Sequence, residues 1–301
     1  MKSKAWLSAV VVAIGALAGG EARALDEFSA QNFRPPIDPW GYVTVEGAKT
    51  LAPDQKFAAL YYDWARRPLI FDDGTTRIEK VRDVHWLDLA GGYGITSIGK
   101  TGGLEAGLDL PIAAQDVWID GAGDSHDSAG LGDLRTDLKL SLGDRDDDFF
   151  ACAFRAYASW PTGRHGMRFM SNDAFTLGGE VAVEGKIDFV RAGLNLGWEW
   201  IDSKFDGFGA RVDDRFHAGF ALAIAPLRDI SGFETLELVF EATHWTLSDR
   251  PWDHEIHSPV EVGGALRYNG RFFGLLGASA GVNRGVGAPD ARVDVALGYS
   301  F

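Results

Sequence analysis

In the stretch "LRTDLKLSL", residues 134–142, four leucines and Thr136 occupy every second position, and charged residues or Ser141 stand between them. Because successive side chains of an extended chain point to opposite faces, its leucines share one face and Arg135, Asp137 and Lys139 share the other. A strand with one apolar and one charged face fits a soluble sandwich or lipocalin-like barrel, with the apolar face turned inward. It fits a membrane barrel equally well, with the apolar face turned to lipid.

The same period of two recurs along the rest of the chain and predicts an all-β protein. We expect twelve strands, with fourteen as the alternative count. They lie near residues 56–66, 82–95, 103–112, 132–143, 148–160, 176–186, 188–201, 215–226, 234–245, 258–268, 271–282 and 290–301.

The lengths of the strands and of their connections favour the membrane barrel. Short links such as "KID" and "YNGR" alternate with long ones at 67–80, 113–131, 161–175, 202–214 and 246–258. Outer-membrane barrels have this asymmetry, with short periplasmic turns and long outer loops. Many of the strands reach about 10 residues or more, which is enough to cross a bilayer at a tilt. We therefore predict an antiparallel transmembrane β-barrel.

Aromatic residues and the carboxyl terminus support this prediction. Tryptophans fall at the expected outer strand ends, and other aromatics fall at the periplasmic ends, in the manner of the two interfacial girdles of such barrels. The chain finishes with "VDVALGYSF", residues 293–301, inside its last strand. This ending resembles the signal by which the barrel assembly machinery captures a final strand, and we assign that signal to Tyr299 and Phe301.

The amino terminus has the pattern of an export signal. Residues 1–24 carry Lys2 and Lys4, a short apolar run, and Ala22-Arg23-Ala24 as a small-x-small cleavage site, so we predict a signal peptide. Its removal takes away three basic residues and one acidic residue, which moves the formal charge from −14 to −16. Such an acidic chain is a poor partner for nucleic acid. We expect it in the cell outer membrane, in contact with outer-membrane lipid.

Residues 25–55 stand apart from the barrel, which we place at 56–301. The segment holds four prolines, and most of it is therefore poor strand material. A further strand at 41–48 would make thirteen, against the even count of bacterial single-chain barrels. We expect a periplasmic or lumen-entering segment.

The N-terminal part of the chain resembles a known barrel module. "NFRPPIDPWGYVTVEGAKTLAPDQ", "LYYDWARRPLIF" and "GYGITS" followed by "GLDLP" are similar to the barrel of OmpA-family proteins of myxobacteria and related deltaproteobacteria. The resemblance is clearest over residues 32–112. It implies an outer-membrane barrel, here without the C-terminal peptidoglycan-binding domain common in that family, and it fixes no substrate.

Several short motifs resemble sites of chemistry. "GITSIGKT", residues 94–101, matches a phosphate-binding loop, but no helix follows it, so we interpret it as a strand end and turn. "DHEIH", residues 253–257, has side chains that could bind a metal, but we interpret it as a solvated outer loop. The acidic runs at 120–127 and 144–148 lack the ligand spacing of a calcium loop. We predict no catalytic residue, no cofactor and no metal site, and an outer-membrane enzyme remains a minor alternative.

The polar strand faces should line the barrel lumen, because charges cannot face lipid. They carry six basic and ten acidic residues, which we expect to face inward: Glu105, Asp109, Arg135, Asp137, Lys139, Arg155, Glu180, Glu184, Arg191, Glu199, Glu237, Glu241, Glu261, Arg267, Arg292 and Asp294. A lumen of this kind is wet or laced with ion pairs. The expected function is a narrow porin-like channel for small solutes, with a closed structural or surface-interaction barrel as the alternative. The oligomeric state stays open.

Overall fold

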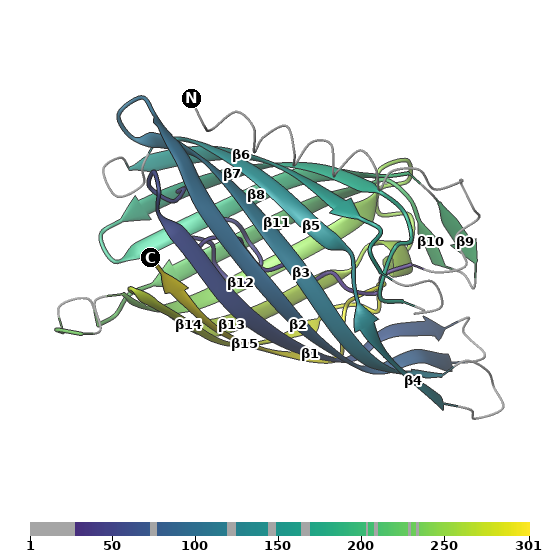
Figure 1. The fold of residues 1–301 in the computed structure, drawn as a ribbon. Coiled ribbons are helices and arrows are strands. Elements are labelled where there is room, and N and C mark those ends of the chain that lie inside the picture. The colour runs from purple at the N-terminus through teal and green to yellow at the C-terminus, as the bar shows by residue number, and fades with distance from the viewer. Residues whose placement is uncertain are drawn as a thin grey trace.

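A computed structural model gives the structure of the protein (Figure 1). It describes residues 28–72, 77–118, 125–143, 149–163, 169–202, 204–207, 210–227, 230–232 and 235–301. The predicted signal peptide lies outside these residues. No helix in the described ranges is long and apolar enough to cross a membrane.

Twelve antiparallel strands in the described part of the chain close into a barrel, each pairing with its neighbours in the ring. In chain order they are β1 (Lys56–Asp72), β2 (Arg77–Ile98), β3 (Gly102–Trp118), β5 (Leu134–Leu142), β6 (Phe150–Trp160), β7 (Thr176–Ile187), β8 (Val190–Ile201), β11 (Arg215–Ile224), β12 (Leu236–Leu247), β13 (Val260–Asn269), β14 (Phe272–Gly281) and β15 (Ala291–Ser300). All twelve predicted strands are present, and the alternative count of fourteen is wrong.

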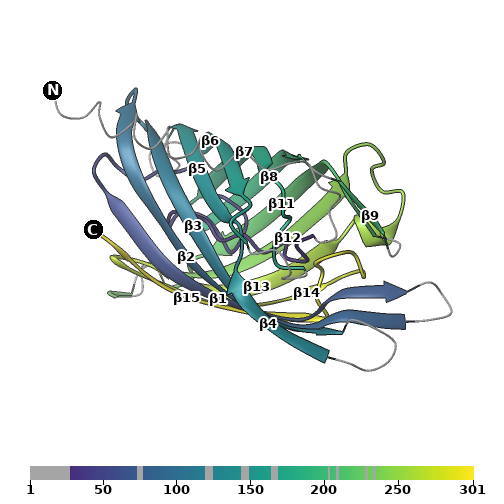
Figure 2. The ribbon, with the colours of Figure 1, turned by 45° about the vertical axis from the view of Figure 1, so that its right-hand side comes forward.

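Two of the expected long outer loops are largely strand, which corrects the prediction for residues 67–80 and 113–131. β1, β2 and β3 run on beyond the barrel wall, and β4 (Ser125–Leu131) pairs with the end of β3 from Ile112 to Trp118. These four strands form an extension that projects from one end of the barrel (Figure 2). In the other long connections, β9 (Phe205–Gly207) pairs with β10 (Ala210–Val212), and η1 (Glu255–His257) is one short 3₁₀ turn.

The barrel closes between its first and last strands. Phe57 of β1 pairs with Ser300 of β15, and ten residue pairs in succession hold the seam. The Phe301 amide donates to the Lys56 carbonyl at 2.9 Å, and the Phe301 ring is 67% exposed. The role of Tyr299 and Phe301 as an assembly signal stays a prediction.

The two faces of the wall differ as the alternation predicts. Leu138 and Leu194 point outward and are 47% and 45% exposed, whereas the adjacent Lys139 and Asn195 point inward and are buried. The outward face is apolar along the other barrel strands as well, with large exposed side chains such as Leu108, Phe220 and Leu276. Such a surface is suited to lipid and would be exceptional in water.

An arginine at Leu138 should therefore destabilise the barrel in a membrane. We expect Leu138→Arg to lower the free energy of unfolding from liposomes by roughly 2–4 kcal/mol, the cost of a guanidinium near the bilayer centre. Ile230→Arg is the matched control, because Ile230 is exposed in the connection between β11 and β12, where the guanidinium reaches water. Equal losses in the two variants would contradict a lipid-facing Leu138.

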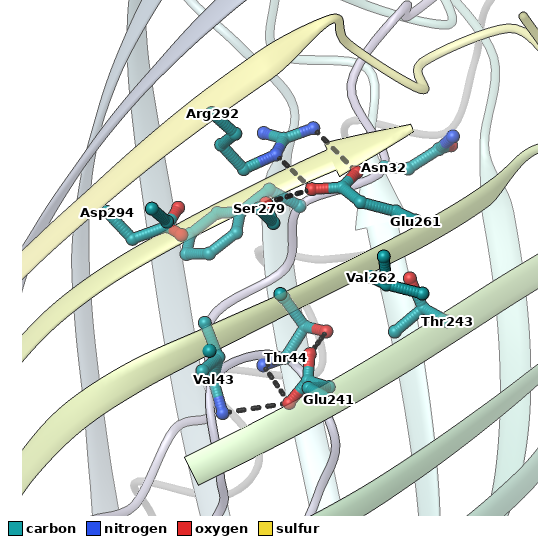
Figure 3. A pocket seen from close by; sticks show the side chains of 14 residues that line it. Asn32, Val43, Thr44, Glu241, Thr243, Glu261, Val262, Ser279, Arg292 and Asp294 are labelled. Carbon is teal, nitrogen blue, oxygen red and sulfur yellow. Dashed lines mark hydrogen bonds and ion pairs between the residues drawn. The ribbon is translucent and has the colours of Figure 1, made fainter. Parts of the chain in front are cut away.

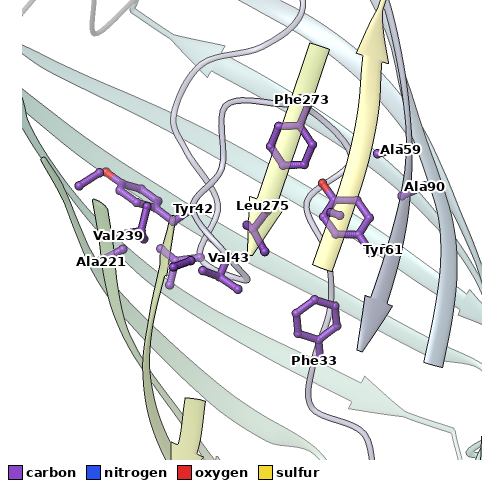
Figure 4. Packing of buried hydrophobic residues seen from close by; sticks show 14 of the residues in the cluster. Phe33, Tyr42, Val43, Ala59, Tyr61, Ala90, Ala221, Val239, Phe273 and Leu275 are labelled. Atoms are coloured by element: carbon purple, nitrogen blue, oxygen red, sulfur yellow. The ribbon is translucent and has the colours of Figure 1, made fainter. Parts of the chain in front are cut away.

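Residues 28–55 run through the inside of the barrel (Figure 1). Their apolar side chains pack against the inner wall, where Phe33, Tyr42 and Val43 share a buried cluster with Tyr61 of β1 and Phe273 of β14 (Figure 4). At the end with the short turns the segment leaves the lumen beside β2, where the Asp54 amide donates to the Gly94 carbonyl at 2.9 Å. We call residues 28–55 the lumen segment.

Candidate functional site

The candidate site is the interior of the barrel, where the polar wall meets the lumen segment. At the loop end, Phe28 packs edge to face on Phe169, with ring centroids 5.2 Å apart. The Ser29 amide donates to Asn172 Oδ1 at 3.0 Å, and the Ala30 amide donates to the Phe169 carbonyl at 3.0 Å. The connection between β6 and β7 thus holds the beginning of the segment.

Asp133, in the connection between β4 and β5, fixes this loop end in turn. Its carboxylate accepts hydrogen bonds from the Asn172 amide at 2.9 Å and from Ser171 Oγ at 2.6 Å. Burial raises the pKa of Asp133 to about 6, and these hydrogen bonds act in the opposite direction. The loop connection that holds the start of the lumen segment therefore contains an aspartate whose pKa is higher than that of an ordinary aspartate.

Arginines of the wall bind the carbonyl groups of the first half of the segment. Arg135 Nη2 donates to the Pro35 carbonyl at 2.6 Å, Arg267 donates to the Pro39 carbonyl, and the Arg191 guanidinium donates to the Trp40 and Gly41 carbonyls at 3.3 Å. These carbonyls lie in irregular backbone, and in the dry interior they need such donors.

Acceptors of the wall bind the amides of the second half. Glu241 of β12 accepts from the amides of Val43 and Thr44 and from the Thr44 hydroxyl (Figure 3). It also accepts from the Val45 amide. Asn195, Glu184 and Glu105 follow along the segment, and they accept from the amides of Glu46 at 2.6 Å, Ala48 at 2.9 Å and Leu51 at 2.6 Å. The wall therefore recognises the segment largely through its backbone.

Lys139 of β5 is the centre of a buried charge cluster between wall and segment. Its Nζ lies 2.5 Å from Asp38 Oδ2 and 3.3 Å from Glu46 Oε2, both in the segment, and 3.7 Å from Glu105 Oε1 in β3. All four side chains are at most 1% exposed. Three carboxylates thus depend on one ammonium group and on neighbouring donors.

A second cluster surrounds Arg34 of the segment. Arg34 pairs with Glu199 of β8, which also accepts from Arg215 Nη2 at 2.5 Å and from the Tyr157 hydroxyl at 2.9 Å. The guanidinium groups of Arg34 and Arg215 lie 5.0 Å and 4.5 Å from the centre of the Trp245 ring. Ion pairs and cation–π contacts together hold the segment across the lumen.

The structure places all sixteen side chains expected in the lumen on its inner wall. Thirteen are buried, and Glu237, Glu241 and Glu261 are half-buried. Sequence reasoning did not assign Asp63, Asp88, Arg215 or His217, which also face inward. On β1, β2 and β11, the alternation of inward and outward side chains indicates that these four residues face inward. The lumen segment also supplies Arg34, Asp38 and Glu46 to the charge clusters. These three lie outside the strands, so no alternation indicates where they point.

Among the described residues, small cavities remain between the wall and the segment. Their volumes are about 70, 40 and 30 Å³, and charged or polar side chains contribute to the lining of each. Polar cavities of this size hold a few water molecules at most. In this conformation the segment thus fills most of the lumen.

The other sequence motifs carry no site in the described residues. "GITSIGKT" is the end of β2 and a turn before β3, as interpreted. In "DHEIH", His257 Nδ1 lies 3.4 Å from Asp253 Oδ1, and the described residues contain no group of three His, Cys, Asp or Glu side chains that could hold a metal ion. The run at 144–148 and most of the run at 120–127 lie outside the described residues.

Comparison with solved structures identifies the fold. The structure is similar to an outer membrane channel from Pseudomonas putida F1, with a TM-score of 0.66 and 13% sequence identity over 84% of this chain and 98% of that chain. At TM-scores of 0.47 and 0.44 it is more loosely similar to the NanC porin and the KdgM porin, with 10% and 8% identity over 82% and 81% of this chain and 98% and 99% of theirs. The first likeness confirms the predicted fold class, an outer-membrane β-barrel of twelve strands.

No family model matches the sequence, and no curated protein matches it. The resemblance to OmpA-family proteins therefore finds no support in the comparisons, and the shared barrel architecture is as far as it reaches.

Proposed function

We propose that this protein is a narrow outer-membrane channel for small solutes, kept closed by its lumen segment. The observation that carries the proposal is the chemistry of the inner wall. With Asp63, Asp88, Arg215 and His217 added to the sixteen expected side chains, these wall residues comprise twelve carboxylates, seven arginine or lysine groups and one histidine. The channel nature of the similar Pseudomonas putida protein supports the same function.

A charged wall has a consequence for the emptied barrel. If the segment withdraws, the wall groups that it now satisfies lose their partners and must be hydrated, because bare charges in a dry lumen are prohibitively costly. An apolar wall would collapse or stay dry, whereas this one would fill with water. The polar wall thus favours a lumen that can conduct over one that is sealed permanently.

The alternative is a closed structural or surface-interaction barrel. The paired charges favour it, since Lys139, Arg155, Arg191 and Arg292 each have carboxylate partners in the observed conformation. A permanent plug needs such pairing, but so does a gate in its closed state. We further propose export by the N-terminal signal, contact with outer-membrane lipid and the barrel assembly machinery, and no catalytic role.

The excess of carboxylates predicts that the open channel prefers cations. In planar bilayers with a potassium chloride gradient, the reversal potential of the purified protein should have the sign of mild potassium selectivity. The preference should fade at high salt, because screening shortens the reach of the wall charges. An anion preference would contradict the charge assignment of the lumen, and a complete lack of conductance would favour the structural barrel.

A further inference from the structure

Two of the polar cavities meet at one aromatic side chain of the lumen segment. The first, of about 70 Å³, is lined by Asp88 of β2, and we call it the Asp88 cavity. The second, of about 30 Å³, is lined by Asp294 of β15 and is called the Asp294 cavity (Figure 3). Phe33 lines both and is itself buried, as Figure 4 shows. The ring therefore stands between two small polar spaces.

Each cavity is lined by a buried aspartate with at least one carboxylate oxygen that has no hydrogen-bond partner among the described residues. Asp88 is 5% exposed, and no hydrogen bond or ion pair reaches its carboxylate from the described part of the chain. Asp294 is 2% exposed, and its Oδ1 has no hydrogen-bond partner there. Asp294 also lies directly across the β1–β15 seam from Asp63, so two carboxylates adjoin in the wall.

The basic groups near these carboxylates are already held by others. Beside Asp88, Arg135 lies 3.0 Å from Asp137 and 3.5 Å from Asp109. Arg34 and Arg215 share Glu199. Beside Asp294, Arg292 lies 2.7 Å from both Asp63 and Glu261. The wall therefore has spare negative charge on both sides of Phe33.

Ionised carboxylates buried without partners are too costly to stand alone, so something must neutralise them. A proton would do so without using the cavities. A small monovalent cation would do so within them, because carboxylate oxygens are suitable hard ligands and polar cavities of this size also admit water. Few carboxylate oxygens face each cavity, which suits weak binding of a partly hydrated ion, as conduction requires.

We propose that small monovalent cations occupy the Asp88 and Asp294 cavities and that the Phe33 ring is the constriction between them. The proposal rests on the channel function and gives it a route past Phe33, from the wall of β12 to β15 at the Asp294 cavity to the wall of β2 and β3 at the Asp88 cavity. While the segment occupies the lumen, the Phe33 ring closes this route, and removal of the ring would join the two cavities.

Conductance tests the constriction. In planar bilayers, Phe33→Ala should raise the potassium conductance several-fold while keeping cation selectivity. Phe273→Ala is the control, because this ring belongs to the same buried cluster but lines neither cavity. An equal rise in both variants, or no rise in Phe33→Ala, would overturn the constriction.

Crystals of the full-length protein soaked in rubidium chloride test the sites independently of conduction. Anomalous density should lie in both cavities, and Asp88→Asn should remove it from the Asp88 cavity alone. Empty cavities, with an infrared band of a protonated carboxyl that Asp88→Asn abolishes, would overturn the cation sites in favour of a proton. Rubidium density in a protein that conducts nothing would uphold the sites and refute the channel function.

Discussion

Lys139→Met is expected to free the lumen segment from the wall. The substitution removes the ammonium group that Asp38, Glu46 and Glu105 share in a fully buried cluster. Loss of one partner of a buried ion pair costs about 3–5 kcal/mol, because the remaining charges stay buried without the cation that offset them. Since each 1.4 kcal/mol changes an equilibrium tenfold, the released state should gain more than about 100-fold in population.

Hydrogen exchange of the segment's amides measures this release directly. The amides of Val43, Glu46 and Leu51, which the wall now protects, should exchange much faster in Lys139→Met, and bilayer recordings should show longer openings. Lys56→Met is the control, because Lys56 begins β1 with an exposed side chain. Unchanged protection in Lys139→Met would mean that the cluster does not hold the segment.

The architecture could be predicted from the sequence because lipid and lumen impose opposite demands on neighbouring residues. The alternation in "LRTDLKLSL" is strong for that reason, and it placed Lys139 and Leu138 on their correct faces. Asp63 of β1 was overlooked, since the inner face of this strand is mostly Phe57, Ala59 and Tyr61, which pack on the lumen segment. That face is nearly as apolar as a lipid face, so its charges do not stand out.

The course of the lumen segment could not be predicted from its residues. Many of its contacts with the wall use backbone groups, such as the three amides on Glu241 and the Pro39 carbonyl on Arg267. The sequence cannot show which backbone amides and carbonyls are bound, because nearly every residue has both. The four prolines indicate only that the segment is not a regular strand. The extension formed by β1 to β4 was also missed. A sheet that projects into water carries polar residues, and its sequence therefore resembles that of a loop.

A disulfide between the segment and the wall should lock the channel shut. A Cβ built on Gly219 of β11 lies 3.7 Å from Val45 Cβ, which is within the range of natural disulfides. The chain has one cysteine, Cys152, so Val45→Cys and Gly219→Cys in a Cys152→Ser background would form a single defined bridge. Oxidised protein should not conduct, because a segment tied at its middle cannot leave the lumen.

The most direct test of the gate is therefore the conductance of this double-cysteine protein in one bilayer before and after a reductant is added. We predict closed channels under oxidising conditions and potassium-selective openings after reduction. The same protein with Val45→Cys alone should conduct throughout. Equal conductance in the oxidised and reduced states, with the bridge shown to have formed, would contradict a channel gated by its lumen segment.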